Sequence, residues 1–497
     1  MPEERTYKVD LLTRVEGEGS FVLRTVGDTV VDARLSIFEA PRFFEAFLRG
    51  RTIDEVPDIV ARICGICPIA YQMSAVWALE SALGYTAPAA IRDLRRLMYC
   101  GEWIESHALH VFLLHAPDFL GYPSAVEMAA DHRALVERGL AIKRAGNRII
   151  ELLGGRAIHP VSVRVGGFSR APTRRELLAL RPELCAGLAE AEQAVAWTAS
   201  LPCPALELDY TFVALRDDRG RYPLEGGDAL VIDGRAPVPL AEFEACFIES
   251  QVEHSNALQC RLADGTPYLT GPLARLHHFA DRLHPRAQVA AEAVGLATTI
   301  RNPYRSIVVR AVEIVHAFAE AIDLIDAYAT IEPPCVDLAP RDAVGFGCSE
   351  APRGACWHRY EVRADGTVAA AKIVPPTSQN QARIERDLIG LAPELLALPH
   401  AEATHRCEQL IRSYDPCISC ATHFLRLDIQ RTEAPACDRG RSSPSAAAPP
   451  VTTRRRCWPP STWPDGPCRA RGWCSRGARG RGWSTSSTRR SRRCCST

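Results

Sequence analysis

Two cysteine pairs near opposite ends of the chain constrain its fold more than any other feature. The first pair is Cys64 and Cys67 in RICGICP, and the second is Cys417 and Cys420 in DPCISCATH. A C-x-x-C spacing places two sulfur atoms on one turn, close enough to bind a single ion. Pro68 indicates that the first pair lies where a loop enters a helix, and the dipole of that helix favours thiolates. If the four sulfurs form one site, the two ends of the chain fold together.

A four-sulfur site of this kind suits three chemistries: structural zinc, an iron-sulfur cluster or a soft transition-metal centre. The spacing within the pairs does not choose among them. A zinc ribbon usually closes its two pairs within about 15 to 20 residues, so a separation of about 350 residues weighs against zinc. A redox dithiol would need only one pair.

The composition narrows the class of protein. A chain of 497 residues, 47% hydrophobic and 24% charged, predicts a globular protein with several domains or one large composite fold. It has no run of 18 apolar residues and no start typical of a secretory signal, so we expect a cytoplasmic protein without a membrane span. Residues 1–423 contain 43 basic and 55 acidic residues, which argues against nucleic acid as a partner.

The periodicity of apolar residues predicts a mainly α fold with peripheral β structure, an α+β class built around a central bundle of long helices. Residues 1–40 alternate polar and apolar, which suits a small N-terminal antiparallel sheet. We expect 41–202 to be helical, 203–280 to be an irregular, partly extended insertion, and 281–423 to be helical with a hairpin over 358–374 and the second cysteine pair. The helix predicted over 303–328 is apolar around most of its circumference, so we expect it at the centre of the bundle.

Residues 424–497 form an Arg-rich extension of different character. They contain 16 arginines, no lysine and four acidic residues, and the sequence loses its apolar periodicity after about Ala434. A basic tail for nucleic acid is one interpretation. We prefer the interpretation that the extension is cleaved, disordered or the product of a shifted reading frame.

The residues around the cysteine pairs resemble the signature segments of the large subunit of nickel-iron hydrogenases. RICGICP and DPCxxCxxH carry the resemblance, together with RVEGEG at 14–19, EAPRG at 350–354 and VPPTSQNQ at 374–381. It extends over about residues 8–428, and the last two segments look most like the soluble, cytoplasmic branch that couples hydrogen to a nicotinamide or a related carrier. The resemblance implies the large-subunit fold over 1–423 and reversible heterolytic cleavage of H2 to protons and electrons.

The resemblance also implies a metal-ligand set. All four thiolates would hold nickel, with Cys64 and Cys417 terminal and with Cys67 and Cys420 bridging to an iron that carries carbon monoxide and two cyanide ligands. Cys417, as a terminal thiolate, would be a catalytic residue that accepts a proton from H2. Soft thiolates suit both metals.

Further residues take implied roles around that centre. Glu16 of RVEGEG matches the glutamate that relays the proton, and Arg353 of EAPRG matches the arginine that stands over the metals and hydrogen-bonds cyanide. Pro376 and Thr377 match the turn that packs against the diatomic ligands. Asp415 would lie beside Arg353 or pair with it. The fixed charge and the forked donors of arginine suit this role.

A second ion and several partners are implied as well. Glu45 and His423 would bind a structural magnesium or iron ion, and a maturation endopeptidase would cut after His423, after nickel-insertion factors have loaded the site. No iron-sulfur motif remains once the four cysteines are assigned, so the clusters would belong to partners: a hydrogenase small subunit, together with flavin- and nicotinamide-binding, diaphorase-like subunits. Glu18 and Tyr71 stand where relatives often have histidine; a phenol still donates a hydrogen bond.

Two other interpretations remain open from the sequence. A non-catalytic relative of the respiratory quinone-subunit type would share the bundle, but it lacks these thiolates. A structural zinc protein would keep the four cysteines without the catalysis. The metal that copurifies distinguishes such a zinc protein from a nickel-iron hydrogenase.

Overall fold

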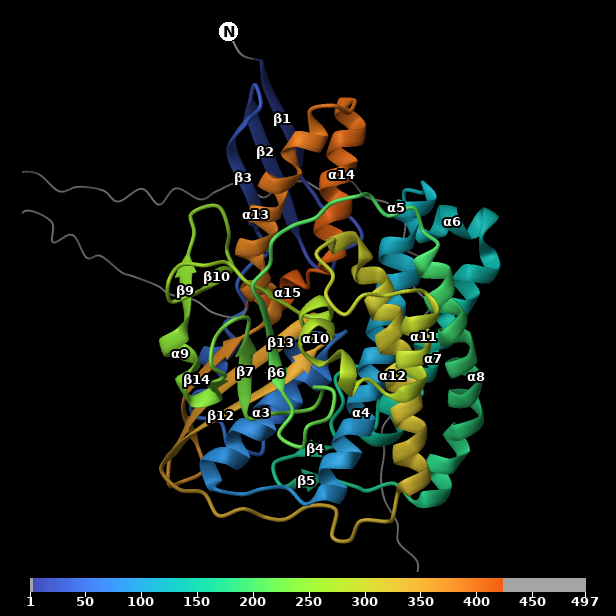
Figure 1. Cartoon of the computed structure of the whole chain (residues 1–497). Coiled ribbons are helices and arrows are strands. Elements are labelled where there is room, and N and C mark those ends of the chain that lie inside the picture. The colour runs from blue at the N-terminus through green and yellow to red at the C-terminus, as the bar shows by residue number, and fades with distance from the viewer. Residues whose placement is uncertain (1–2, 423–497) are drawn as a thin grey trace, which may run out of the picture. The chain divides into compact units, whose positions relative to one another are not determined.

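The computed structural model describes residues 3–422, so His423 and the extension over 424–497 lie outside the described residues. Long helices pack beside several small, mostly antiparallel sheets (Figure 1). This arrangement confirms the predicted α+β class with a central helix bundle. Within the described residues, no helix combines the length and the apolar composition needed to cross a membrane.

The helix bundle is built on one buried helix, α12 (Ser306–Ala327). Most of its side chains are buried, and it packs against α4 and α8. The prediction over 303–328 is confirmed, although the first three residues form a separate 3-10 turn. The other long helices are α3 (Pro68–Leu83), α4 (Ala89–Ala108), α7 (Arg133–Gly154) and α8 (Arg174–Ala199).

Local sequence signals fix the ends of these helices. Thr173 and Glu176 form a reciprocal capping box at the start of α8. Pro68 is the first residue of α3, and Gly84 ends it with a φ of 69°. The shorter helices are α1 (Phe44–Leu48), α2 (Val56–Val60), α5 (Ala116–Leu120), α6 (Ala125–Asp131), α9 (Phe243–Cys246), α10 (Pro272–Phe279), α11 (Pro285–Ala293), α13 (Pro376–Leu395), α14 (His400–Ser413) and α15 (Ile418–Ala421).

The predicted N-terminal antiparallel sheet is present. It consists of β1 (Glu4–Val9), β2 (Gly19–Val26) and β3 (Thr29–Ile37) in that order. Alternate side chains of β2 are buried, among them Phe21 and Leu23, as the period of two requires. The RVEGEG segment over 14–19 lies mostly in the loop between β1 and β2 rather than within a strand.

A second sheet lies against α3 and was only partly predicted. The hairpin of β13 (Gly354–Val362) and β14 (Val368–Val374) was predicted, but β12 (Ala343–Ala351) was not. Gly345 and Gly347 explain the omission, because glycine is a poor strand former. A Cβ at these positions would lie 1.9 Å from the Ala78 carbonyl oxygen and 2.4 Å from that of Ser74, so only glycine lets β12 approach α3.

The insertion over 203–280 contains short strands, in agreement with its partly extended pattern. Two small sheets have the strand orders β11-β6-β7-β8 and β10-β9. Their bounds are β6 (Phe212–Arg216), β7 (Ala229–Ile232), β8 (Val238–Pro239), β9 (Phe247–Gln251), β10 (Leu258–Leu262) and β11 (Leu269–Thr270); β4 (Val163–Arg164) and β5 (Gly167–Phe168) pair elsewhere.

Candidate metal centre

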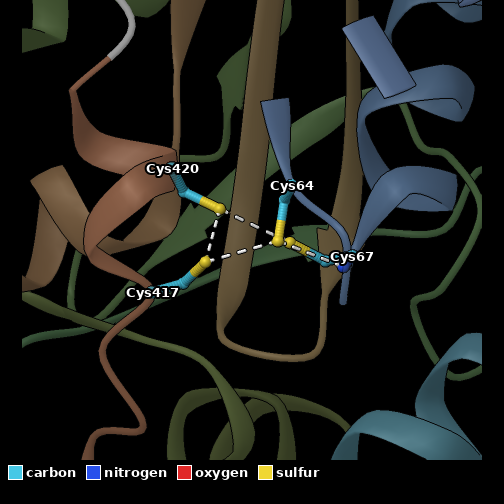
Figure 2. A group of neighbouring side chains, drawn as sticks. All are labelled: Cys64, Cys67, Cys417 and Cys420. Carbon is cyan, nitrogen blue, oxygen red and sulfur yellow. Dashed lines mark hydrogen bonds between the residues drawn. The ribbon is translucent and has the colours of Figure 1, made fainter. Parts of the chain in front are cut away.

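The structure brings the two cysteine pairs together although about 350 residues separate them (Figure 2). The Sγ atom of Cys64 lies 3.5 Å from that of Cys417, and the Sγ atom of Cys67 lies 3.5 Å from that of Cys420. Cys417 and Cys420 are 2.7 Å apart at sulfur. All four side chains are buried thiols outside any disulfide, and their sulfurs lie within 4.8 Å of one another.

The backbone of each cysteine loop turns its sulfurs toward those of the other loop. Cys64 follows a 3-10 turn over Ala61–Ile63, and its Sγ accepts hydrogen bonds of 3.3 Å from the N–H groups of Ile66 and Cys67. Cys67 directly precedes α3, as Pro68 predicted. On the other side, the N–H of Cys417 donates to Thr377 Oγ1 at 3.0 Å. Both loops are therefore held by hydrogen bonds that leave the sulfurs able to bind an ion.

The donor set fits a soft metal ion. A tetrahedral site with metal–sulfur bonds of about 2.3 Å places its sulfurs about 3.8 Å apart, close to the two separations of 3.5 Å found between the pairs. Burial raises the pKa of the Cys417 thiol, because a thiolate there would lose its hydration. A bound cation supplies the compensating charge, so the site favours thiolates once metal is present.

Glu16 lies directly beside the sulfurs. Its Oε2 accepts a hydrogen bond of 3.1 Å from Cys417 Sγ and one of 3.0 Å from the N–H of Ser419. Its carbonyl oxygen accepts from the N–H of Ile418 at 2.9 Å, which fastens the RVEGEG loop to the second cysteine pair. Burial raises the pKa of the Glu16 carboxyl. Gly17, at φ 88°, is crowded against Glu39 and Ile418, so a side chain there would displace the loop.

Glu39 lies beside this group, nearer to solvent, and was not predicted. Ser419 Oγ donates to Glu39 Oε1 at 2.7 Å, and the Glu39 side chain is 19% exposed. The N–H of Glu18 also donates to Glu39, at 3.4 Å. Glu18 itself is exposed. Glu39 is 380 residues from Ser419 in the chain, and no local motif marks the pair.

Arg353 and Asp415 form a buried ion pair next to the cysteines. Arg353 lies in the two-residue turn between β12 and β13, and its Nη2 is 3.1 Å from Asp415 Oδ2. Its Nε donates to the Asp415 carbonyl oxygen at 2.8 Å, and its Nη1 donates to Ser106 Oγ at 3.3 Å. Burial raises the pKa of Asp415, and the charge of Arg353 opposes that shift. The predicted pairing of these two residues is present.

Two more residues hold the cysteine loops and were not predicted. Arg42 Nη2 donates to the carbonyl oxygen of Ile63 at 2.6 Å and also to that of Ser419, so one guanidinium bridges the residues that precede Cys64 and Cys420. Glu102 is buried in α4 and accepts from the N–H of Ile69 at 2.6 Å, within the first turn of α3. A carboxylate at a helix N-terminus is electrostatically favourable.

The remaining predicted residues occupy different places. Pro376 and Thr377 begin α13 next to Cys417. Glu45 lies in α1, where its Oε1 accepts from the N–H of Ile373 at 2.9 Å; His423, its predicted partner, lies outside the described residues. Tyr71 is buried, but among the described residues its hydroxyl has no hydrogen-bond partner, so the structure does not contain a bond from this phenol to sulfur.

The four buried thiols define a protein that can bind a soft metal ion. A family model described as nickel-dependent hydrogenase matches residues 42–138 and 276–423. The chain is 34% identical to the alpha chain of sulfhydrogenase 1 from Pyrococcus furiosus, over 84% of this chain and 98% of that one. It is 29% identical to an F420-non-reducing hydrogenase of Methanothermobacter marburgensis, over 83% of this chain and 94% of that one.

A solved structure of similar fold agrees with these relatives. The crystal structure of an NAD+-reducing [NiFe]-hydrogenase in the H2-reduced state superposes with a TM-score of 0.77 at 29% identity, over 85% of this chain and all of that one. The chain belongs to the nickel-dependent hydrogenase family. It is the catalytic subunit of an oxidoreductase that acts on H2. This membership argues against the structural zinc interpretation.

Proposed function

We propose that this subunit catalyses the reversible heterolytic cleavage of H2 in the cytoplasm and delivers the electrons to NAD(P) or a similar acceptor. The electrons pass through the iron-sulfur clusters of a small subunit and then through a flavin-containing module. The observation that carries the proposal is the convergence of four buried sulfurs with a carboxylate, Glu16, hydrogen-bonded to one of them. The similarity to an NAD+-reducing enzyme supports the choice of acceptor.

The cysteines hold the metals in this proposal. Cys64, Cys67, Cys417 and Cys420 would hold the nickel, and Cys67 and Cys420 would also hold an iron that carries carbon monoxide and two cyanides. When bound, the metals supply a Lewis-acidic position at which H2 is polarised. The protein binds and releases the proton: Cys417 Sγ takes it first, and Glu16 Oε2, 3.1 Å away, receives it. Ser419 and Glu39 continue toward solvent.

The residues around the metals would orient the ligands that the metals carry. Arg353 is buried and held by Asp415, so its remaining N–H groups have a fixed direction from which to donate to cyanide. Pro376 and Thr377, at the start of α13, would pack against the same ligands. Glu45, with His423 and the backbone near Ile373, would hold a magnesium or iron ion.

The processed subunit comprises residues 1–423. An endopeptidase removes the Arg-rich extension after nickel-insertion factors have supplied the metal, so the mature chain ends at His423.

The proposal predicts a specific set of properties for the assembled, processed enzyme. Elemental analysis will find nickel and iron in the large subunit, and infrared spectra will contain bands of bound cyanide and carbon monoxide, in a region where protein does not absorb. Intact mass will correspond to a chain that ends at residue 423. Zinc as the sole metal, or an active enzyme that retains all 74 residues of the extension, would contradict the proposal.

Electrons leave where the first cysteine loop reaches the surface. Gly65 is exposed, one residue from the buried Cys64, and a Cβ on it would lie 3.9 Å from both His159 and Ile158. The loop that carries these two residues is fixed by the Nδ1 of His159, 2.7 Å from the Ala61 carbonyl oxygen. Ile158 is 60% exposed and Val161 is 50% exposed. An apolar surface this close to the thiols fits the small subunit.

A charge in this surface is expected to weaken the assembly. We expect Ile158→Arg to lower the amount of small subunit that copurifies by at least about 10-fold, since a charge buried at the centre of an interface costs more than about 1.4 kcal/mol. Val126 in α6 is also apolar and is 81% exposed, so Val126→Arg is the matched control and should assemble normally. Equal recovery of small subunit with both variants would place the docking surface elsewhere.

A further inference from the structure

A second group of metal-binding side chains lies in the insertion, and the hydrogenase reaction does not use it. His277 and His278 are adjacent in α10, and Asp233 follows β7 in the turn that leads to β8. We propose that these three residues bind a divalent transition-metal ion of the class that prefers imidazole and carboxylate ligands, represented by Zn²⁺, and that the ion fastens the insertion sheet to α10.

The ligand atoms already have the spacing of a coordination sphere. The Nε2 of His277 is 2.9 Å from Asp233 Oδ1, and the Nε2 of His278 is 3.5 Å from the same oxygen. One donor atom from each of the three residues lies within 4.8 Å of the others. Ligands about 2.1 Å from a tetrahedral ion are about 3.4 Å apart, close to the two separations between histidine and aspartate atoms found here.

Hydrogen bonds on the outer atoms orient two of the ligands. The Nδ1 of His277 is 2.8 Å from Thr299 Oγ1, which leaves its Nε2 to face the site. Asp233 Oδ2 accepts from the N–H of Phe212 at 2.9 Å, which leaves Oδ1 for the ion. Metal-binding histidines commonly have such a bond on the other ring nitrogen. Thr299 and Phe212 therefore act as positioning residues.

His278 has one competing contact. Its Nε2 is 3.2 Å from the Phe212 carbonyl oxygen, to which it donates when no ion is bound. Coordination replaces this bond, and the carbonyl oxygen still accepts from the N–H of Asp233 at 3.2 Å.

Exposure leaves the site open to an ion from solution. The side chains of Asp233, His277 and His278 are 27%, 26% and 10% exposed, so water completes the coordination. The three residues come from two elements: α10, which packs against β6 and α12, carries both histidines, and Asp233 follows β7. An ion between them fastens the insertion sheet to α10, which gives it a structural role.

Zinc binding by the assembled enzyme tests the site. We expect the wild type to bind one more equivalent of Zn²⁺ than Asp233→Asn, measured by equilibrium dialysis and elemental analysis, and we expect His277→Gln to bind that ion about 10- to 100-fold more weakly. Zinc should also raise the midpoint of thermal unfolding of the wild type but not of Asp233→Asn, because a ligand of the folded state stabilises it.

The control is a histidine with one carboxylate partner instead of a cluster. His284 Nε2 lies 3.1 Å from Asp323, and His284→Gln should keep the extra zinc equivalent and the thermal shift. The proposal is overturned if the wild type and Asp233→Asn bind the same number of zinc ions, or if His284→Gln loses as much zinc as His277→Gln. His277→Gln, which leaves the Asp233 hydrogen bond to Phe212 intact, provides the comparison if Asp233→Asn does not fold.

Discussion

Cys417→Ser is expected to remove bound nickel and hydrogenase activity together. Cys417 lies closest to the rest of the site: its sulfur is 2.7 Å from that of Cys420, 3.5 Å from that of Cys64 and 3.1 Å from Glu16 Oε2. A serine hydroxyl is a harder donor and stays protonated at neutral pH, so it does not replace a soft thiolate.

Replacing a ligand such as Cys417 should lower bound nickel more than replacing a residue that only orients a ligand. Changes to groups that merely orient a metal's ligands cost about 10- to 100-fold in affinity or activity, so the loss of a ligand should lower bound nickel by more than about 100-fold. Elemental analysis of the purified protein measures the metal, and H2-dependent dye reduction measures the activity. We expect both to fall to background.

The matched control is another buried thiol. Cys407 lies in α14, is fully buried and does not belong to the group of four sulfurs. Cys407→Ser should keep its nickel and most of its activity, since it makes the same chemical change outside the site. Full nickel content in Cys417→Ser, with Cys407→Ser unchanged, would show that the four sulfurs are not the ligands.

The features that could be predicted from the sequence depend on local pattern. The all-round apolar pattern over 303–328 placed α12 at the bundle centre, and alternation predicted the sheet that contains β2. Pro68 located the start of α3, so the position of Cys67 before a helix followed. The pairing of Cys64 with Cys417 was expected because a shared metal requires it, not because any nearby residue indicates it.

The features that were missed depend on contacts between distant segments. β12 was missed because Gly345 and Gly347 disfavour a strand by themselves and are needed only for close packing on α3. Arg42 and Glu102 hold the cysteine loops through backbone groups, which no side-chain motif reveals. Glu39 depends on a hydrogen bond to Ser419, at the other end of the chain.

Glu16→Gln is expected to stop turnover while the metals remain bound. The amide has the shape of the carboxylate, and its oxygen still accepts from the N–H of Ser419, so the RVEGEG loop should keep its place. The amide does not accept and release a proton at neutral pH, however. Proton transfer by a positioned side chain contributes about 10²- to 10⁴-fold to a rate, and we expect H2 oxidation to fall by that factor.

Two matched substitutions make this result specific to the proton path. Glu18→Gln changes an exposed neighbour that does not contact sulfur and should leave the rate unchanged. Glu39→Gln changes the next group on the path and should slow the rate less than Glu16→Gln, because water also reaches this partly exposed position. Infrared bands and nickel content should be the same in all three variants. If Glu16→Gln kept full activity, the proton would leave Cys417 by another route. If Glu16→Gln and Glu18→Gln lost equal activity, the charge of the loop would matter, and not the hydrogen bond to Cys417.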